Sequence, residues 1–297
     1  MTNSEILSLQ LPQHADQRQR ALALIERAEC HDKVAPFSEA FLRGLGDEAL
    51  AHQHLVVEDK AVAALAPDGG VELVVAPDAR RQGLASEILS RVLEQRSDAS
   101  VWAHGNLPAA AATARKHGLE VARRLLVMAV DGPAFDAAAE MPGLSDGFEA
   151  LDYPAAVKRW GVEAVDNAWL NTNNEAFSWH PEQGGWDIAR LHQGMDTDWF
   201  DPHGVLFLYQ GSELAGFHWT KQHPGGVGEV YVVGLSSAFR GKGLGDPLLR
   251  MGLSHLKKDG ATRVILYVEA DNAPAVARYE DLGFKIAEDH VAYQLNA

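Results

Sequence analysis

The sequence predicts a mixed α+β protein that consists of two similar β-rich units in tandem. Its 297 residues correspond to two domains at roughly 150 residues per domain. In both halves, short apolar stretches with the alternation of strands are followed by stretches with the apolar spacing of helices. One segment of the first half also recurs in the second half at a fixed distance along the chain. Together these three observations favour a duplicated α+β architecture.

The recurring segment is an apolar strand, a short turn, a basic loop with glycine, and an amphipathic helix. Arg80 aligns with Arg240 and Gly83 with Gly243, an offset of 160 residues in both cases (240 − 80 and 243 − 83). Each copy continues with a second strand that ends at an asparagine, a short helix, a turn of glycine and an apolar residue, and a final strand. The final strands are expected over residues 121–130 and 286–295.

The segment between the two copies, residues 136–148, is expected to be a linker. It is rich in glycine, proline and small residues, which form strands and helices poorly. The expected domains are therefore residues 1–135 and residues 149–297.

Charge and cysteine content exclude several classes of protein. With 41 acidic and 26 basic residues, the formal net charge is −15. Nucleic-acid backbones and anionic membranes attract basic proteins, so neither is expected as a partner. The single cysteine, Cys30, cannot form an internal disulfide, which fits a reducing compartment. Because residues 1–5 do not resemble a signal peptide and no apolar run approaches about 18 residues, we expect a cytoplasmic protein. We also expect a monomer.

The two basic loops have the chemistry of a phosphate site. The start of a helix offers unpaired N–H groups and the positive end of the helix dipole, and glycine lets the backbone approach a pyrophosphate closely. Asp246 is expected at the N-cap of the second helix, although a carboxylate disfavours an anion there, and Pro247 suits the first helical position. The Walker A and Gly-x-Gly-x-x-Gly patterns are both missing. A single glycine-rich turn of this kind could also serve only to connect a strand to a helix. Two copies in the same strand–loop–helix context favour phosphate binding.

These residues carry a resemblance to a known family. The Arg-x-x-Gly-x-Gly/Ala loops, together with Asn272, Tyr279 and the pair Gly283-Phe284, resemble the GCN5-related N-acetyltransferases (GNAT). The resemblance implies two tandem GNAT domains, each a mixed, mostly antiparallel twisted sheet flanked by helices. It also implies acetyl-CoA as cosubstrate, one per domain, and no metal. The residues that it implies for acetyl-CoA binding are Leu73, Val74, Val75, Arg81, Gln82, Gly83, Leu84, Ala85, Ser86, Val233, Gly234, Leu235, Arg240, Gly241, Lys242, Gly243, Leu244, Gly245, Asp246, Asn272, Ala273, Pro274, Ala275, Val276 and Ala277.

Further segments resemble the mycothiol synthases, a branch of this family with two domains. These segments are residues 36–39, 102–105, 180–186, 199–202, 216–221 and 228–234. The resemblance implies transfer of acetyl to the cysteinyl amine of cysteinyl-glucosaminyl-inositol, which makes mycothiol. It implies substrate contacts at Glu39, Glu182, Lys221, Glu229 and Tyr267. An exposed turn for Lys221 and a core strand position for Tyr267 remain the alternatives.

Acetyl transfer from a thioester to an amine requires the amine to lose a proton and the leaving thiolate to gain one. The resemblance places the general base, acting through water, at Glu229 and the general acid at Tyr279. The alternatives are an exposed carboxylate at a strand end for Glu229 and core packing for Tyr279. One departure from the family pattern is Gly241, which replaces a second cation after Arg240, so backbone N–H groups are expected to contribute more to pyrophosphate binding.

The N-terminal copy lacks this acid–base pair. The 160-residue offset places Gly69 at the position of Glu229, and it places the nearest carboxylate, Glu72, on Val232. Where the second copy has its tyrosine, the first has Thr113 or Ala114. We therefore expect the N-terminal domain to bind CoA or shape the substrate site without catalysing.

Other functions stay open at this point. A GNAT enzyme for another amine (an aminoglycoside, a polyamine or a protein N-terminus) and a non-catalytic CoA-binding sensor are the alternatives. A metal site is not expected at His52, His54 and His180, because no convergent ligand set accompanies them. The tryptophans that precede the second copy are expected to pack in the core rather than to stack on a sugar; these are Trp179, Trp186, Trp199 and Trp219.

Overall fold

The computed structural model describes residues 5–141, 143–179 and 183–296, and its contacts divide the chain into two compact units. The N-terminal unit comprises Met1–Leu126, Glu269–Asp271 and Glu288–Ala297. The C-terminal unit comprises Val127–Val268 and Asn272–Ala287. No helix of the described residues is long and apolar enough to cross a membrane.

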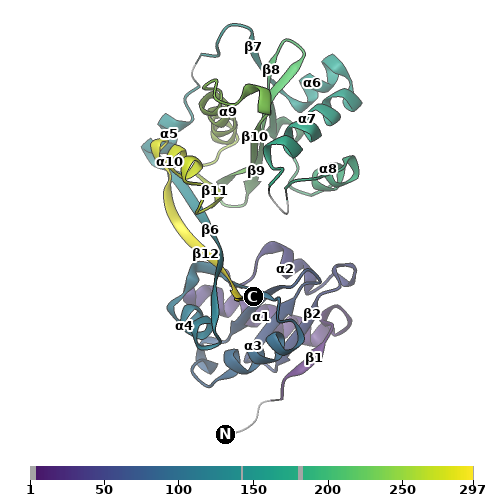
Figure 1. Ribbon diagram of the computed structural model, residues 1–297, viewed down its shortest axis with the longest axis vertical. Coiled ribbons are helices and arrows are strands. Elements are labelled where there is room, and N and C mark those ends of the chain that lie inside the picture. Colours follow the sequence, from purple (N-terminus) through teal and green to yellow (C-terminus); the bar gives the residue numbers. More distant parts are fainter. Residues whose placement is uncertain (1–4, 142, 180–182, 297) are drawn as a thin grey trace. The chain divides into compact units, whose positions relative to one another are not determined.

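The N-terminal unit is a sheet with helices on both faces (Figure 1). Its strands are β1 (Leu7–Leu9), β2 (Gln53–Val57), β3 (Ala61–Leu65), β4 (Gly70–Val75), β5 (Ser100–Ala103) and the first part of β6 (Leu119–Asp131). Its helices are α1 (Ala15–Asp32), α2 (Glu39–Gly44), α3 (Leu84–Gln95) and α4 (Pro108–Lys116), with short 3-10 turns at Leu11–Gln13, Glu48–Leu50, Pro77–Ala79 and His104–Asn106.

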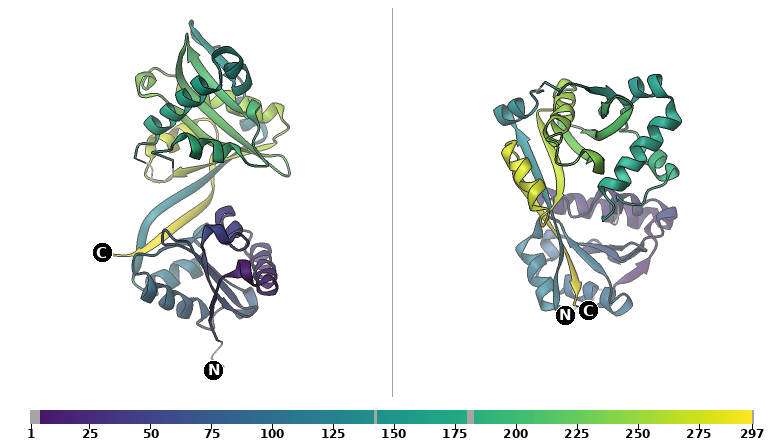
Figure 2. Two further views of the ribbon diagram at one scale, coloured as in Figure 1. Left: turned by 90° about the vertical axis from the view of Figure 1, so that its right-hand side faces the viewer. Right: turned by 45° about the horizontal axis from the view of Figure 1, so that its top comes forward.

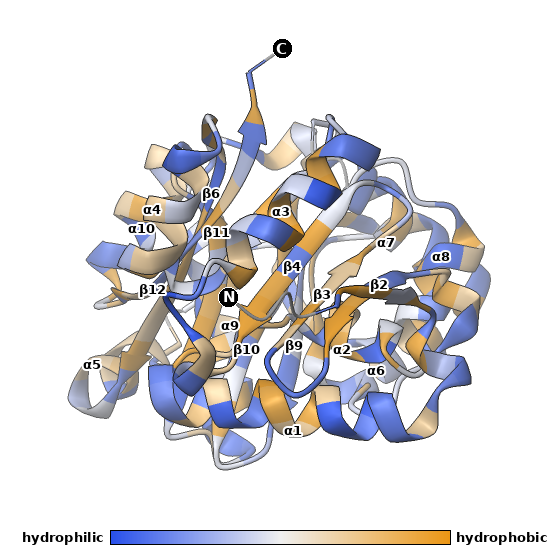
Figure 3. Ribbon diagram, turned by 90° about the horizontal axis from the view of Figure 1, so that it is seen from below, coloured by the Kyte–Doolittle hydropathy of each residue, from blue (hydrophilic) through white to orange (hydrophobic). Residues whose placement is uncertain are grey.

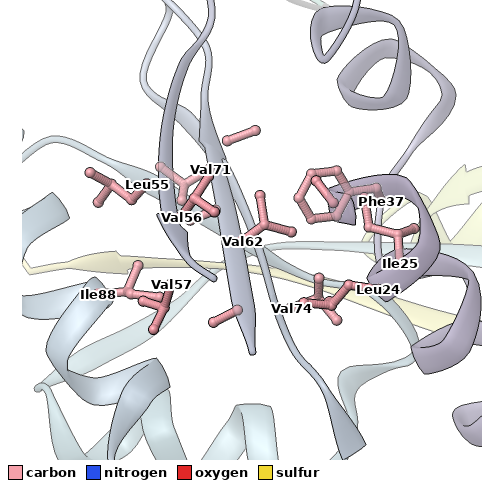
Figure 4. Packing of buried hydrophobic residues seen from close by; sticks show 14 of the residues in the cluster. Leu24, Ile25, Phe37, Leu55, Val56, Val57, Val62, Val71, Val74 and Ile88 are labelled. Atoms are coloured by element: carbon pink, nitrogen blue, oxygen red, sulfur yellow. The ribbon is translucent and has the colours of Figure 1, made fainter. Parts of the chain in front are cut away.

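In this unit an antiparallel series is followed by one parallel pair. Strands β1 to β4 pair antiparallel in chain order, and β4 then pairs parallel with β5. Every residue of β3 is buried, because helices lie on both faces of the sheet. Figure 4 shows Leu24 and Ile25 of α1 on one side of the strands and Ile88 of α3 on the other. Burial of these apolar side chains from two sides stabilises the unit.

The C-terminal unit repeats the same pattern. Its strands are β7 (Phe148–Asp152), β8 (Val205–Gln210), β9 (Glu213–His223), β10 (Val227–Leu235), β11 (Arg263–Glu269) and parts of β6 and β12 (Lys285–Leu295). Its helices are α5 (Gly132–Ala138), α6 (Tyr153–Trp160), α7 (Val162–Ala176), α8 (Ile188–Met195), α9 (Gly245–Lys258) and α10 (Ala273–Asp281), with 3-10 turns at Pro202–Gly204 and Ser237–Phe239. Strands β7 to β10 pair antiparallel in chain order, and β10 pairs parallel with β11. Helices α7 and α9 cover opposite faces of the sheet (Figures 1 and 2).

The predicted α+β fold, with a mostly antiparallel sheet flanked by helices in each half, is confirmed. The hydropathy pattern explains why the sequence adopts it: in Figure 3 apolar residues concentrate in strands such as β3 and β4, whereas helix α1 carries both colours. The amphipathic helices can bury one face against the sheet while the other face stays in water.

The compact units differ from the expected domain bounds at two places. Helix α5, Gly132–Ala138, extends into the segment that was expected to be a linker. The end of β12 belongs to the N-terminal unit, where Val291 pairs with Ala103 of β5. Sequence repetition identifies corresponding segments, but it does not say which sheet a terminal strand joins.

Candidate functional site

The loop between β10 and α9 has the backbone geometry of a phosphate site. Gly241 and Gly243 have φ angles of +74° and +75°, a region that glycine adopts without steric cost. Among the described residues, no side chain caps the start of α9, whose N-cap is Leu244. The N–H groups of the first turn and the positive end of the helix dipole are therefore suited to an anion.

The helix begins earlier than the sequence suggested, and this changes the role of Asp246. Helix α9 starts at Gly245, so Asp246 and Pro247 lie inside its first turn rather than at the N-cap and the first helical position. The Asp246 carboxylate is 3.1 Å from Nε of Arg250 and also contacts the guanidinium of Arg278. Two arginines thus neutralise the carboxylate that would otherwise repel an anion at this helix start.

Arg240 holds the loop in place through the backbone. Its Nη2 donates to the carbonyl oxygen of Glu175 at 2.7 Å, and its Nε lies 3.4 Å from the carbonyl oxygen of Leu235. The Glu175 carboxylate in turn accepts the N–H of Ser237 at 2.9 Å. This bond, with further hydrogen bonds from the serines and the nearby Arg240 charge, lowers the pKa of Glu175. The end of α7 and the loop between β10 and α9 are therefore fixed to each other.

A cavity of about 830 Å³ lies at this loop, within the C-terminal unit. Ten of the residues predicted to bind acetyl-CoA line it: Val233, Gly234, Leu235, Arg240, Gly243, Gly245, Asp246, Asn272, Pro274 and Ala275. The remaining lining residues are Leu248, Leu249, Arg278 and Tyr279. The sequence prediction missed Leu248 and Leu249, although a helix that starts at Gly245 returns to the same face after three or four residues. It also missed Arg278, which lies on α10 four residues after the predicted Pro274. The predicted residues Gly241, Lys242, Leu244, Ala273, Val276 and Ala277 are not among the lining residues.

Helix α10 brings Tyr279 to the cavity. Asn272 is the N-cap of this helix, and its Oδ1 accepts the N–H of Ala275 at 3.4 Å. Tyr279 lines the cavity and packs against Phe284 with 5.8 Å between ring centroids. Burial raises the pKa of Tyr279 to about 12, so the phenol carries its proton at neutral pH and is able to donate it.

Glu229 is a buried strand residue, not an exposed carboxylate at a strand end. Its side chain is 8% exposed, and Oε2 lies 2.6 Å from Nε2 of His223. Glu229 does not line the cavity, whereas Val233 of the same strand does. Four residues of extended strand span about 13 Å, so proton transfer from an amine at the cavity to Glu229 requires at least one intervening water.

Lys221 lies opposite Glu229 in the β9–β10 ladder and is buried rather than placed in an exposed turn. Its Nζ lies 4.7 Å from the ring centroid of Trp199. Trp199 in turn packs against Trp219, which is fully buried, at 5.8 Å. The expected packing role therefore fits Trp219, while Trp179 is 60% exposed.

The other predicted substrate contacts have different surroundings. Tyr267 is 50% exposed on β11, so it is not a core residue of the sheet. Glu39 is the first residue of α2 and is exposed. Glu182 and His180 lie outside the described residues.

The N-terminal loop has the same backbone course with different neighbours. Arg80 Nε donates to the carbonyl oxygen of Val75 at 3.1 Å, as Arg240 does to Leu235, and its guanidinium also pairs with Asp32 at 2.6 Å. Arg81 has a φ angle of +66°, where the second copy has a glycine at +74°. Neither of the two cavities described here is lined by this loop; the second, of about 360 Å³, lies on α1.

The histidines that the sequence analysis considered as metal ligands are core residues. His52 and His54 are buried, and burial lowers the pKa of His54 to about 4. Within the described part of the chain, a different trio has close ligand atoms: Asp201, His255 and Asp259, all within 4.8 Å of one another. The His255 ring pairs with both carboxylates, at 3.5 and 3.0 Å, which accounts for their proximity without an ion.

Comparisons with known proteins place this geometry in a family. The acetyltransferase (GNAT) family model matches residues 167–284, which include the loop and α10. A mycothiol acetyltransferase of Corynebacterium aurimucosum is 49% identical, over 95% of this chain and 96% of that protein. The chain belongs to the mycothiol acetyltransferase family. Another member, from Corynebacterium glutamicum, is 46% identical over 99% of both chains.

Solved structures agree with this family on the fold. A tandem GNAT protein from the clavulanic acid biosynthesis pathway has a TM-score of 0.70 at 17% identity, with 97% of both chains covered. A GCN5-related N-acetyltransferase from Sphaerobacter thermophilus has a TM-score of 0.64 at 20% identity, covering 97% of this chain and 94% of that one. As a member of the mycothiol acetyltransferase family, the chain is an acetyltransferase with two GNAT units, and acetyl-CoA is the cosubstrate of GNAT enzymes.

Proposed function

We propose that the chain transfers the acetyl group of acetyl-CoA to the cysteinyl amine of cysteinyl-glucosaminyl-inositol, which forms mycothiol. The cavity beside the uncapped start of α9, with Tyr279 in its wall, carries the proposal. The names of relatives that match nearly the full chain support the choice of product.

The cavity fits the proposed cosubstrate. The glycine turn and the N–H groups of the first turn of α9 would hold the pyrophosphate, while Arg240 fixes the loop. The remaining cavity wall, which includes Leu248, Leu249 and Pro274, suits the less polar pantetheine arm. Asp246 does not oppose binding, because Arg250 and Arg278 pair with it.

The reaction needs two proton transfers, and the C-terminal unit has a group for each. The amine nitrogen forms a bond to the acetyl carbon while the bond from that carbon to sulfur breaks. Glu229, held by His223 at 2.6 Å, accepts the amine proton through water. The Tyr279 phenol, whose pKa burial raises to about 12, donates a proton to the departing thiolate. Lys221 and Tyr267 are the proposed substrate contacts of this unit, and Glu39 that of the N-terminal unit.

The N-terminal unit is proposed to bind CoA or to shape the substrate site without catalysing, because it has no phenol at the position of Tyr279. The aligned residue is Thr113 or Ala114, and the Thr113 hydroxyl donates to the carbonyl oxygen of Ala109 in its own helix at 2.9 Å. This position of the N-terminal unit therefore has no phenol that could act as a proton donor.

The deciding experiment measures CoA release and acetylated product with purified protein, acetyl-CoA and a panel of amines. We expect turnover with cysteinyl-glucosaminyl-inositol at least about a hundredfold above an aminoglycoside, a polyamine and a peptide N-terminus, a ratio that lost hydrogen bonds can supply. A higher rate with another amine would replace the proposed substrate. Binding of acetyl-CoA with no release for any amine would instead indicate a sensor.

A further inference from the structure

The N-terminal unit contains a chain of buried or half-buried ionisable side chains that the proposed mechanism does not use. Glu72 of β4 is 2% exposed, and its Oε1 lies 2.8 Å from Nε2 of His104. Nδ1 of His104 lies 3.0 Å from Nδ1 of His290, a residue of β12. A backbone N–H donates to each terminal member of this series: Ser38 N–H to Glu72 Oε2 at 2.7 Å, and Gly105 N–H to His290 Nδ1 at 3.2 Å.

The hydrogen bonds determine where the protons of this chain lie. A backbone N–H can only donate, so Nδ1 of His290 accepts from Gly105 and carries no proton. The contact between the two Nδ1 atoms then requires a proton on Nδ1 of His104. Between Nε2 of His104 and Glu72 there must be a second proton, because two acceptors do not form a hydrogen bond. Glu72 also accepts the N–H of Ser38, a bond that favours the ionised carboxylate. His104 is therefore an imidazolium that donates from both nitrogens, one donation to each side.

The surroundings agree with this assignment. Burial and the charge of His104 lower the pKa of His290 to about 4, so His290 is neutral and keeps its proton on Nε2, 3.5 Å from Glu288. Two further titratable groups interact electrostatically with this chain of side chains: the charge of Asp289 acts on His290, and the charge of Glu72 acts on His52. The His104 ring also stacks over Trp102 with 6.3 Å between centroids and an interplanar angle of 13°.

Glu72 connects two segments that the sequence analysis singled out separately. Segment 102–105 supplies His104, and segment 36–39 supplies the N–H of Ser38. Ser38 is also the N-cap of α2, where its hydroxyl accepts the N–H of Phe41 at 3.4 Å. The next residue, Glu39, begins that helix. The carboxylate of Glu72 thus fixes the backbone from which Glu39 projects.

We infer that Glu72, held in place by the imidazolium of His104 and by His290 behind it, is a positioning residue: the hydrogen bond that it accepts from Ser38 fixes the start of α2 and thereby Glu39 for the amine substrate. The part played by Glu39 rests on the proposed function, whereas the protonation of His104 does not. Glu72, His104 and His290 act through the backbone of residues 38–39 and are not themselves proposed to touch substrate.

Protonation is tested by long-range ¹H–¹⁵N correlation of the histidine rings at pH 7, with His104→Asn for assignment. We expect both ring nitrogens of His104 to show the shifts of an imidazolium. Glutamine has nearly the same shape as glutamate, so in Glu72→Gln the amide oxygen can accept the N–H of Ser38 while the amide NH₂ donates to Nε2 of His104. His104 should then become neutral, with its proton on Nδ1. A neutral His104 in the unaltered chain would overturn the inference.

Positioning is tested by steady-state kinetics and a double-mutant cycle. Glu72→Ala removes the acceptor for Ser38 N–H, a bond to a charged group, so we expect the KM for the amine to rise about tenfold with kcat and the KM for acetyl-CoA unchanged. Glu72→Gln should stay within about twofold of the unaltered chain, because the amide restores that bond. Glu58→Gln, an exposed carboxylate of the same unit, is the control and should change nothing.

The cycle with Glu39→Gln separates an indirect role from a direct one. If Glu72 acts through Glu39, adding Glu72→Ala to Glu39→Gln raises KM by less than about twofold further. The positioning role would be overturned if the increases in KM from Glu72→Ala and Glu39→Gln multiplied fully in the double variant. It would also be overturned if Glu72→Ala and Glu72→Gln raised KM equally. An unchanged KM in Glu39→Gln would overturn the substrate role of Glu39 and with it this positioning role, while product formation still tests the proposed reaction. If Glu72→Ala does not fold, the Glu72→Gln spectra still decide the protonation.

Discussion

The two strand–loop–helix copies share a backbone course, but they differ in the groups arranged around it. In both, an arginine at the start of the loop directs its Nε to the carbonyl oxygen of the preceding strand end, Val75 in one copy and Leu235 in the other. Beyond this bond, the guanidinium of Arg80 pairs with the Asp32 carboxylate, whereas that of Arg240 donates to a backbone carbonyl. The arginines common to both loops thus serve loop structure in each copy, so they do not distinguish a catalytic loop from a non-catalytic one.

The groups that differ are those that we propose to move or hold protons. The C-terminal copy has the pair Glu229 and His223, which does not line the cavity, and a half-buried phenol, Tyr279, which does. The N-terminal copy has a Glu–His pair as well, Glu72 with His104, but both of its ends are tied to backbone N–H groups or to another histidine. A Glu–His pair whose hydrogen bonds are all made within its unit suits positioning, whereas Glu229 is proposed to transfer a proton through water. The following experiments test this distinction.

The largest effect is expected for Glu229→Gln, which keeps the shape of the side chain but removes the proposed base. General-base catalysis contributes about 10²–10⁴-fold, so kcat should fall by about a thousandfold while acetyl-CoA binding, measured by calorimetry, is retained. Glu213→Gln, an exposed carboxylate on β9 of the same unit, is the matched control. A fall in kcat of less than about fivefold in Glu229→Gln would remove Glu229 from the mechanism.

A somewhat smaller loss in kcat is expected for Tyr279→Phe, which removes only the proposed proton donor to the thiolate. Loss of a general acid should lower kcat by about a hundredfold. Because the pKa of Tyr279 is raised to about 12, the phenol stays protonated up to pH 10, and no decline of kcat below that pH should depend on this residue. Tyr293→Phe makes the same change in the N-terminal unit, where the hydroxyl donates to Asn106. Equal kcat losses in the two variants would show that the difference between the copies is not catalytic.

How much of this site the sequence could predict depends on the range of the interactions. The loop glycines and Asn272 belong to local motifs, and most of the predicted residues near them line the cavity. The register of β10 is not local: a bulge between Val230 and Val232 shifts it against β9. Strand β4 has no such bulge, so the one extra residue in β10 moves the counterpart of Glu229 from Gly69 to Gly70. The absence of a carboxylate at this position still follows.

Partners that are far apart in the chain carried no signal in the sequence. His290 lies 186 residues after His104 in the chain. The two side chains meet only because the end of β12 pairs with β5. Arg278 neutralises Asp246 across 32 residues. Such contacts depend on which strands and helices become neighbours, which periodicity and spacing do not determine.

The pH dependence of stability should differ between the two units. Burial lowers the pKa values of His54 and His290 in the N-terminal unit, and of His218 in the C-terminal unit, to about 4. The unfolded chain, with a histidine pKa of about 6.5, binds more protons between pH 6.5 and 4. The free energy of unfolding therefore falls as the pH falls through this window, by about 2 kcal/mol per histidine between pH 7 and pH 5.

Urea unfolding at both pH values measures this loss. His218→Gln cannot titrate, so it should lower the pH-dependent loss by about a third if the three histidines contribute equally. His31→Gln, with a side chain 62% exposed, should leave it unchanged. A loss that is equal in the unaltered chain and in His218→Gln would contradict the neutral state of the buried ring.

The smallest expected effect compares one glycine in each loop. Gly243 and Gly83 have φ angles of +75° and +91°, and a Cβ at either position would meet nothing within 4 Å. Alanine at each position therefore introduces the same backbone strain, about 1–2 kcal/mol, and no steric clash. If only the C-terminal loop serves the reaction, Gly243→Ala raises the KM for acetyl-CoA by about tenfold, the equivalent of 1.4 kcal/mol. Gly83→Ala should lower the melting temperature as much as Gly243→Ala does, and it should leave the KM for acetyl-CoA unaltered. Because the strain is matched, a rise in KM for Gly83→Ala would show that both loops contribute to turnover, and the distinction between the copies would then rest on their proton-carrying groups alone.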